Sequence, residues 1–135
     1  MSKINTKVTD SVDFFKGNKP SDLTAKFGSP LYVYSEEILR QRCRDVKNLV
    51  KYPKFSVNYS AKANSNLAFL EIVHEEGLNV DAMSPGEIFV ELKAGFKPEQ
   101  IFYISNNVTA EEMKFAIDHD VLISVDSVSQ LENLR

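Results

Sequence analysis

The chain has 135 residues, with 43% hydrophobic and 26% charged, which is enough for one globular domain with a core of its own. The net charge of -3 argues against nucleic acid or an anionic membrane as a partner. No apolar run approaches the roughly 20 residues of a membrane span, no secretory signal is recognisable at the start, and the single cysteine suits a reducing compartment, so we expect a cytoplasmic protein.

Residues 1–34 are predicted to form an N-terminal arm that ends in a short strand. The first part is polar and has no clear period. A short helix is expected from Ser21 to Gly28, because glycine favours a helix end and Pro30 cannot continue one. The apolar run Leu31–Tyr34 then predicts the strand.

A longer amphipathic helix is predicted next, with Ser35 as its N-cap and two glutamates in its first turn. Its apolar face consists of Leu39, Cys43, Val46 and Val50, which recur at steps of four, three and four. Because Cys43 belongs to this face, we interpret it as a packed core thiol and not as a nucleophile.

From Phe55 onward, strands and helices alternate, and strands are expected near residues 55, 79, 100 and 121. Such repetition requires parallel strands that are covered by helices. No Gly-x-Gly-x-x-Gly follows the first strand, so a dinucleotide-binding sheet is disfavoured and a (β/α)8 barrel is favoured. A barrel needs eight strands and typically about 250 residues. The prediction is therefore an α/β fold in which residues 35–135 form about four βα units, the first half of a barrel that the chain completes with a longer polypeptide or a partner.

Several residues predict where the helices begin and end. Ser84 with Glu87 and Thr109 with Glu112 have the spacing of capping boxes, in which each side chain satisfies a free backbone N–H. Gly77 and Gly95 are expected to end the helices before them. His74 and His119 lie late in helices and receive no catalytic role, and no group of residues has metal-ligand spacing, so no metal is predicted.

The candidate site lies where the strands end, because active sites of parallel (β/α) folds form at the carboxyl ends of strands. Lys62 follows the first strand between two alanines, and Asp81 follows the apolar centre of the second. An amine in this position can anchor an anion, act as a general base, or attack a carbonyl as a Schiff-base nucleophile. A surface lysine paired with a carboxylate explains Lys62 equally well from spacing alone, and Asp81 is as readily a strand-end carboxylate.

Several stretches, in order, resemble the fold-type III pyridoxal-phosphate decarboxylases, and among them the diaminopimelate decarboxylases. "NYSAKANSN" resembles their Tyr-x-x-Lys-Ala-Asn segment, and "FGSPLYVYS" resembles the Gly-Thr-Pro-Leu-Tyr-Val-Tyr stretch that precedes the barrel. "LNVDAMSPGEIFVELKAGFKPEQIFY" is similar to the Asp-x-x-Ser-x-Gly-Glu segment and its continuation, and "VDSVSQLENL" to Val-Asp-Ser-x-x-Glu-Leu. The resemblance covers residues 21–135.

This resemblance implies that Lys62 carries pyridoxal 5'-phosphate as a Schiff base and that Asp81 belongs to the cofactor site. It further implies decarboxylation of meso-2,6-diaminopimelate to L-lysine in lysine biosynthesis, by a protein that is a homodimer when complete. The family's glycine-rich phosphate cradle and C-terminal β-domain have no counterpart in these residues, so the chain alone is expected to be inactive.

Two departures from the family's pattern bear on the site. Ser105-Asn106-Asn107-Val108 stands where the family usually has Gly-Asn-x-Lys, and Gln130 stands where Glu is usual. Two alternatives remain open: a relative acting on arginine, ornithine or carboxynorspermidine, since substrate-discriminating residues of the family lie mostly downstream, and a catalytically silent fragment or assembly module, since the cofactor pocket is incomplete.

Overall fold

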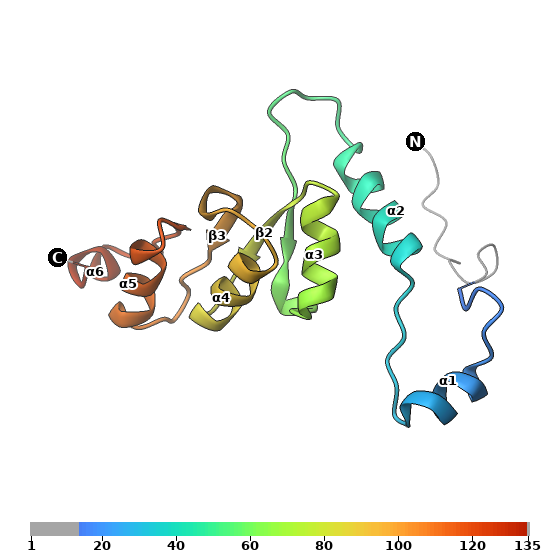
Figure 1. Ribbon diagram of the computed structural model, residues 1–135. Coiled ribbons are helices and arrows are strands. Elements are labelled where there is room, and N and C mark those ends of the chain that lie inside the picture. Colours follow the sequence, from blue (N-terminus) through green and yellow to red (C-terminus); the bar gives the residue numbers. More distant parts are fainter. Residues whose placement is uncertain (1–13, 135) are drawn as a thin grey trace. The chain divides into compact units, whose positions relative to one another are not determined.

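The computed structural model describes residues 14–134 and divides the chain into two compact units, with the boundary between Leu39 and Arg40. The first unit contains α1 (Pro20–Phe27) and the start of α2 (Glu36–Lys47). The remainder of α2 and all the strands belong to the second unit (Figure 1). Across the described part of the chain, no helix has both the length and the apolar character needed to cross a membrane.

In the first unit, α1 occupies nearly the predicted range, but the predicted strand does not form. Pro20 is the first residue of α1, where its missing N–H costs nothing, and Gly28 ends the helix with a positive φ of 90°. Residues 31–34 have no strand assignment, so the prediction of a short strand there was wrong. A strand needs a neighbour for its backbone groups, and none of the strand pairings within residues 14–134 includes these residues.

Helix α2 begins as predicted and buries less of its apolar face than predicted. The Ser35 side chain accepts a hydrogen bond from the Ile38 N–H at 3.4 Å, as an N-cap does. Cys43 is 4% exposed, and this burial raises the pKa of its thiol. Val46 and Val50 remain 39% and 47% exposed, so the expected stripe is buried only around Cys43.

The second unit is built on a parallel sheet of four strands in the order β1-β2-β3-β4. This is the first part of the expected barrel, with each strand hydrogen-bonded to the next one in sequence. The strands are short: β1 (Asn58–Ser60), β2 (Asn79–Ala82), β3 (Ile101–Tyr103) and β4 (Leu122–Ile123).

Helices separate the strands and cover one face of the sheet. α3 (Leu67–Glu75), α4 (Pro85–Lys93) and α5 (Ala110–Asp118) lie in sequence order beside the strands, with α4 in contact with both α3 and α5 (Figure 1). The short helix α6 (Val128–Glu132) follows β4, and two 3-10 turns, η1 (Ala61–Ala63) and η2 (Pro98–Gln100), complete the unit. The core between helices and sheet contains Leu70, Val80, Ile88, Tyr103 and Met113, each at most 1% exposed.

Of the two predicted capping boxes, the one at α5 forms as expected and the one at α4 differs in a single hydrogen bond. Thr109 and Glu112 form a reciprocal capping box at α5. At α4, the Ser84 hydroxyl accepts from the Glu87 N–H, but the Glu87 carboxylate accepts from the N–H of Met83, one residue earlier than in the standard box.

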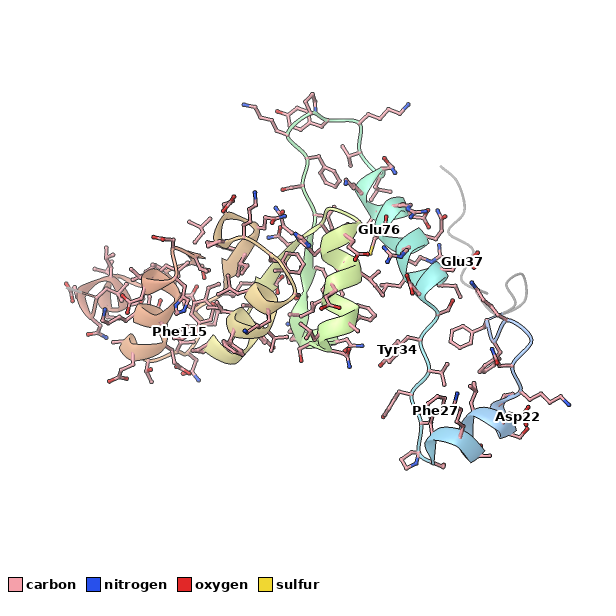
Figure 2. The ribbon with its side chains drawn as sticks, in the orientation of Figure 1. Asp22, Phe27, Tyr34, Glu37, Glu76 and Phe115 are labelled. Carbon is pink, nitrogen blue, oxygen red and sulfur yellow. The ribbon has the colours of Figure 1, made fainter. Side chains whose placement is uncertain are left out.

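An ion-pair cluster joins α2 to the end of α3 within the second unit (Figure 2). Glu76 accepts from Arg44 at 2.7 Å and from Arg40 at 3.2 Å, and Arg40 also reaches Glu75 at 2.6 Å. The hydrogen bond from Arg44 is the main reason that the pKa of Glu76 lies below its usual value, because it stabilises the carboxylate. This cluster holds α2 against the element that follows the lysine-bearing turn.

Candidate cofactor site

Lys62 lies in η1, the turn that begins where β1 ends. Ala61 before it is completely buried and anchors the turn, whereas Lys62 itself is exposed. The Tyr59 hydroxyl donates to the carbonyl of Asn64 at 3.4 Å and closes the turn around the lysine. Within residues 14–134, Lys62 has no ion pair and no hydrogen bond through its amine, so the pairing with a carboxylate that would make it an ordinary surface lysine is not formed.

Asp81 lies on β2, at the same edge of the sheet as the lysine turn. Its register partner on β1 is Ser60, and β1 runs directly into the turn with Lys62. The Ser60 hydroxyl donates to Asp81 Oδ1 at 2.7 Å, and both residues are partly buried. The two predicted site residues thus lie at the ends of neighbouring parallel strands, and both belong to the carboxyl edge of the sheet.

The ends of β3 and β4 form a second polar group, which includes both departures from the family's pattern. Ser105 is completely buried, and its hydroxyl donates to the carbonyl of Ser124. Gln130 Nε2 donates to the Ser105 carbonyl at 2.8 Å, while its Oε1 accepts from the Asp126 N–H at 2.7 Å. A glutamate at position 130 could make only the second of these bonds, because an ionised carboxylate has no donor. The glutamine therefore ties the loop after β3 to the start of α6.

Two buried polar groups lie on the helix-covered side of this edge and were missed in the sequence. Glu91 of α4 is completely buried, and neither carboxylate oxygen has a hydrogen-bond partner in the described structure. Burial raises the pKa of Glu91 to about 8, and the nearby charges of Glu87 and Asp81 add to the rise. The Tyr103 hydroxyl is likewise buried without a partner, and its pKa is raised mainly by burial. Glu91 is therefore a protonated acid at neutral pH.

Other places in the described residues offer less for binding. No group of three or more histidine, cysteine, aspartate or glutamate residues in the part of the chain that the structure describes could hold a metal ion. A hollow of about 250 Å³ lies within the first unit, lined by Phe14, Phe15, Leu23 and Val33 among others, and it contains none of the predicted site residues.

Two observations bear on whether Lys62 and Asp81 could hold a carbonyl cofactor. The Lys62 side chain is exposed, and within residues 14–134 its amine has no ion pair and no hydrogen bond. The adjoining carboxylate of Asp81 is held by a hydrogen bond and supplies a negative charge at the same edge. These residues fit an aldehyde cofactor; they include no phosphate cradle.

Comparison with protein families gives a match over residues 36–135 to the pyridoxal-dependent decarboxylases, in their pyridoxal-binding domain. Among curated relatives, diaminopimelate decarboxylase of Methanothermobacter thermautotrophicus is 46% identical over 115 residues, which cover 84% of this chain and 27% of the relative. The corresponding enzyme of Bacillus subtilis is 36% identical over 116 residues, covering 84% of this chain and 26% of the relative.

Solved structures give the same picture. The crystal structure of diaminopimelate decarboxylase from Helicobacter pylori complexed with L-lysine matches with a TM-score of 0.80 at 30% identity, over 86% of this chain and 30% of that chain. The Vibrio vulnificus lysine/ornithine decarboxylase complexed with putrescine matches with a TM-score of 0.76 at 20% identity, which shows a shared fold. The chain thus spans little more than a quarter of the length of the relatives it matches.

Proposed function

Because the chain belongs to the pyridoxal-dependent decarboxylases, we propose that it is the N-terminal part of a diaminopimelate decarboxylase, which releases CO2 from meso-2,6-diaminopimelate and yields L-lysine. The observation that carries the proposal is the position of Lys62: an exposed amine on the turn after β1, at the carboxyl edge of a parallel sheet, with no ion-pair or hydrogen-bond partner among residues 14–134. The sequence identity to diaminopimelate decarboxylases supports this substrate over arginine, ornithine or carboxynorspermidine.

The chain's own residues have distinct tasks in this proposal. Lys62 would hold the cofactor aldehyde through its Nζ, with release of water, and Asp81 would supply a fixed negative charge at the same edge. Pyridoxal phosphate, when bound, provides the electron sink that decarboxylation of an amino acid requires. The hydrogen bond from Tyr59 to Asn64 holds the lysine turn in its shape, so that the amine is presented from a defined position.

Further parts of the enzyme come from outside these residues. Four strands form half of an eight-stranded barrel, and the relatives are more than three times as long. We propose that the remaining strands and the C-terminal β-domain come from a longer polypeptide or a companion chain, and that the complete enzyme is a cytoplasmic homodimer. A catalytically silent fragment is the competing interpretation for the chain by itself.

The proposal is tested by trapping the cofactor on the protein. The chain is incubated with pyridoxal 5'-phosphate, treated with borohydride and digested, and the labelled lysines are quantified by mass spectrometry. We expect Lys62 to carry most of the label and the label to be lost in Lys62→Arg, which keeps the positive charge but cannot form the bond. Lys54→Arg, a change at an exposed lysine before β1, is the matched control and should leave labelling unchanged. Label spread evenly over the lysines would contradict the proposal.

The substrate is tested separately, on the chain together with any polypeptide that co-purifies with it. Release of CO2 from meso-2,6-diaminopimelate is compared with release from arginine and ornithine at equal concentrations. A preference for diaminopimelate supports the assignment, and a preference for either of the others would replace it. Labelling at Lys62 without CO2 release from any of the three would favour the silent-fragment interpretation.

A further inference from the structure

The open face of the sheet is polar on β1 and β2, opposite the helices. Register pairs Asn58 with Asn79 and Ser60 with Asp81, and residues two apart on a strand point to the same face. The residues between them point the other way: Val80 and Ala82 are completely buried against the helices. Two successive layers of paired polar side chains therefore lead along the open face towards the turn with Lys62.

This polar area ends at β3. Phe102 is the register partner of Asp81, and Leu122 of β4 is the partner of Phe102, so both belong to the open face. The interior of a (β/α)8 barrel is usually filled by bulky apolar side chains, and Phe102 and Leu122 fit this pattern on β3 and β4. The polar pairs of β1 and β2 are an exception, and one member of each pair belongs to β1, the strand that leads into the lysine turn.

The layer nearest Lys62 contains a defined hydrogen bond. Ser60 Oγ donates to Asp81 Oδ1 at 2.7 Å, which is short enough for a charge-assisted bond. On its other side Asp81 has Phe102, whose side chain has no donor. Within residues 14–134, Ser60 is the one hydrogen-bond partner of the Asp81 carboxylate. The direction of this carboxylate is therefore set by the serine hydroxyl.

We propose that Ser60 is a positioning residue, which holds the Asp81 carboxylate in a single orientation at the edge where Lys62 reacts. The inference rests on the proposed function for its consequence at Lys62, but not for the orientation itself. An aspartate without this bond would exchange among its staggered rotamers, and its negative charge would be spread over several positions at this edge of the sheet.

The orientation is measured directly by NMR on the cofactor-free chain, from the three-bond couplings between the Asp81 Hα and its two Hβ protons. In the wild type we expect one large and one small coupling, as for a single rotamer. Ser60→Ala should give two similar, averaged couplings, and Ser60→Thr, which retains a hydroxyl, should restore the unequal pair. Ser56→Ala is the matched control at an exposed serine before β1 and should leave them unequal. Averaged couplings in the wild type, or unchanged couplings in Ser60→Ala, would overturn the proposal.

The consequence at the site is measured by the rate at which pyridoxal 5'-phosphate is trapped on Lys62, across a range of pH. If the bond contributes as a typical intramolecular hydrogen bond does, its loss is expected to lower the trapping rate about threefold to tenfold in Ser60→Ala, with Ser60→Thr close to the wild type. Couplings that change while the rate and its pH profile do not would restrict Ser60 to a structural role and overturn its role at the site. If the wild type is not labelled at Lys62, the proposed function fails, and the couplings still decide whether Ser60 orients Asp81.

Discussion

The two faces of the sheet differ in what the strands contribute to them. Towards the helices, Val80, Ala82, Ile101 and Tyr103 are at most 1% exposed and form an apolar layer. On the open face, β2 presents Asp81, which pairs with Ser60 of β1 at the edge with Lys62. Alternate residues of one short strand thus serve stability on one side and candidate chemistry on the other.

One residue breaks this division. Glu91 lies in the helix-covered layer, where its carboxyl group has no hydrogen-bond partner among the residues that the structure describes, whereas Asp81 accepts a hydrogen bond on the open face. The charge of Asp81 contributes to the raised pKa of Glu91, so a charge on the open face affects the buried acid across the sheet. The difference teaches that burial and hydrogen bonding, and not residue type, decide which acid is available as a charge.

In the comparison of the two faces of the sheet, the largest change in the free energy of unfolding is expected on the helix-covered face, at Ile88. Its side chain is completely buried on α4 against the sheet. Ile88→Ala should lower the free energy of unfolding by about 2–5 kcal/mol, because it removes apolar contacts and leaves a cavity. The measurement is urea unfolding followed by circular dichroism. A loss below about 1 kcal/mol would mean that the helix-covered layer is not a tightly packed core in solution.

A stabilising effect of similar size is expected at Glu91, and it depends on pH. The folded state keeps the proton of Glu91 up to a pKa of about 8, whereas the unfolded chain releases it near the ordinary glutamate pKa of 4.5. Between these two pKa values the free energy of unfolding falls as pH rises, and above about pH 8 it falls no further on account of Glu91. At pH 7 the expected cost is roughly 3 kcal/mol, from about 1.4 kcal/mol for each pH unit.

Replacement of this acid should therefore stabilise the protein. Glu91→Leu is expected to raise the free energy of unfolding by about 2–3 kcal/mol at pH 7, and by much less at pH 4.5. Glu91→Gln is the matched control: it should remove the pH dependence and give a smaller gain, since its buried amide also lacks partners. The measurement is unfolding in urea at a series of pH values. A wild-type stability that does not fall between pH 5 and 8 would contradict the buried, protonated acid.

Much of this fold could be predicted from the sequence, because its signals are local. The regular spacing of apolar runs and the capping residue Thr109 located the alternating strands and helices. The strand bounds were less predictable: β1 begins at Asn58 and not at Phe55, because a strand extends only where a neighbour pairs with it. The run at residues 31–34 failed as a strand for the same reason.

In the candidate site, too, some features could be predicted from the sequence and others could not. Lys62 and Asp81 could be located because strand ends are visible in the sequence, although their roles remain predictions. The bond from Ser60 could not be predicted, since it depends on the register between β1 and β2. Glu91 was missed because a glutamate in a helix is normally exposed; the one available signal was its place three residues after Ile88, on the same helical face.

The smallest effect is expected on the open face, at Leu122. This side chain is 66% exposed, and its register partner is Phe102 on the same face. Leu122→Ser should change the free energy of unfolding of this chain by about 0.5 kcal/mol or less, because little apolar surface leaves a buried environment. Urea unfolding of Leu122→Ser and Ile88→Ala under the same conditions tests the two faces against each other. A loss comparable with that of Ile88→Ala would show that the open face is covered in solution, by another copy of the chain or by a companion, and sedimentation of the wild type would then show a species larger than the monomer.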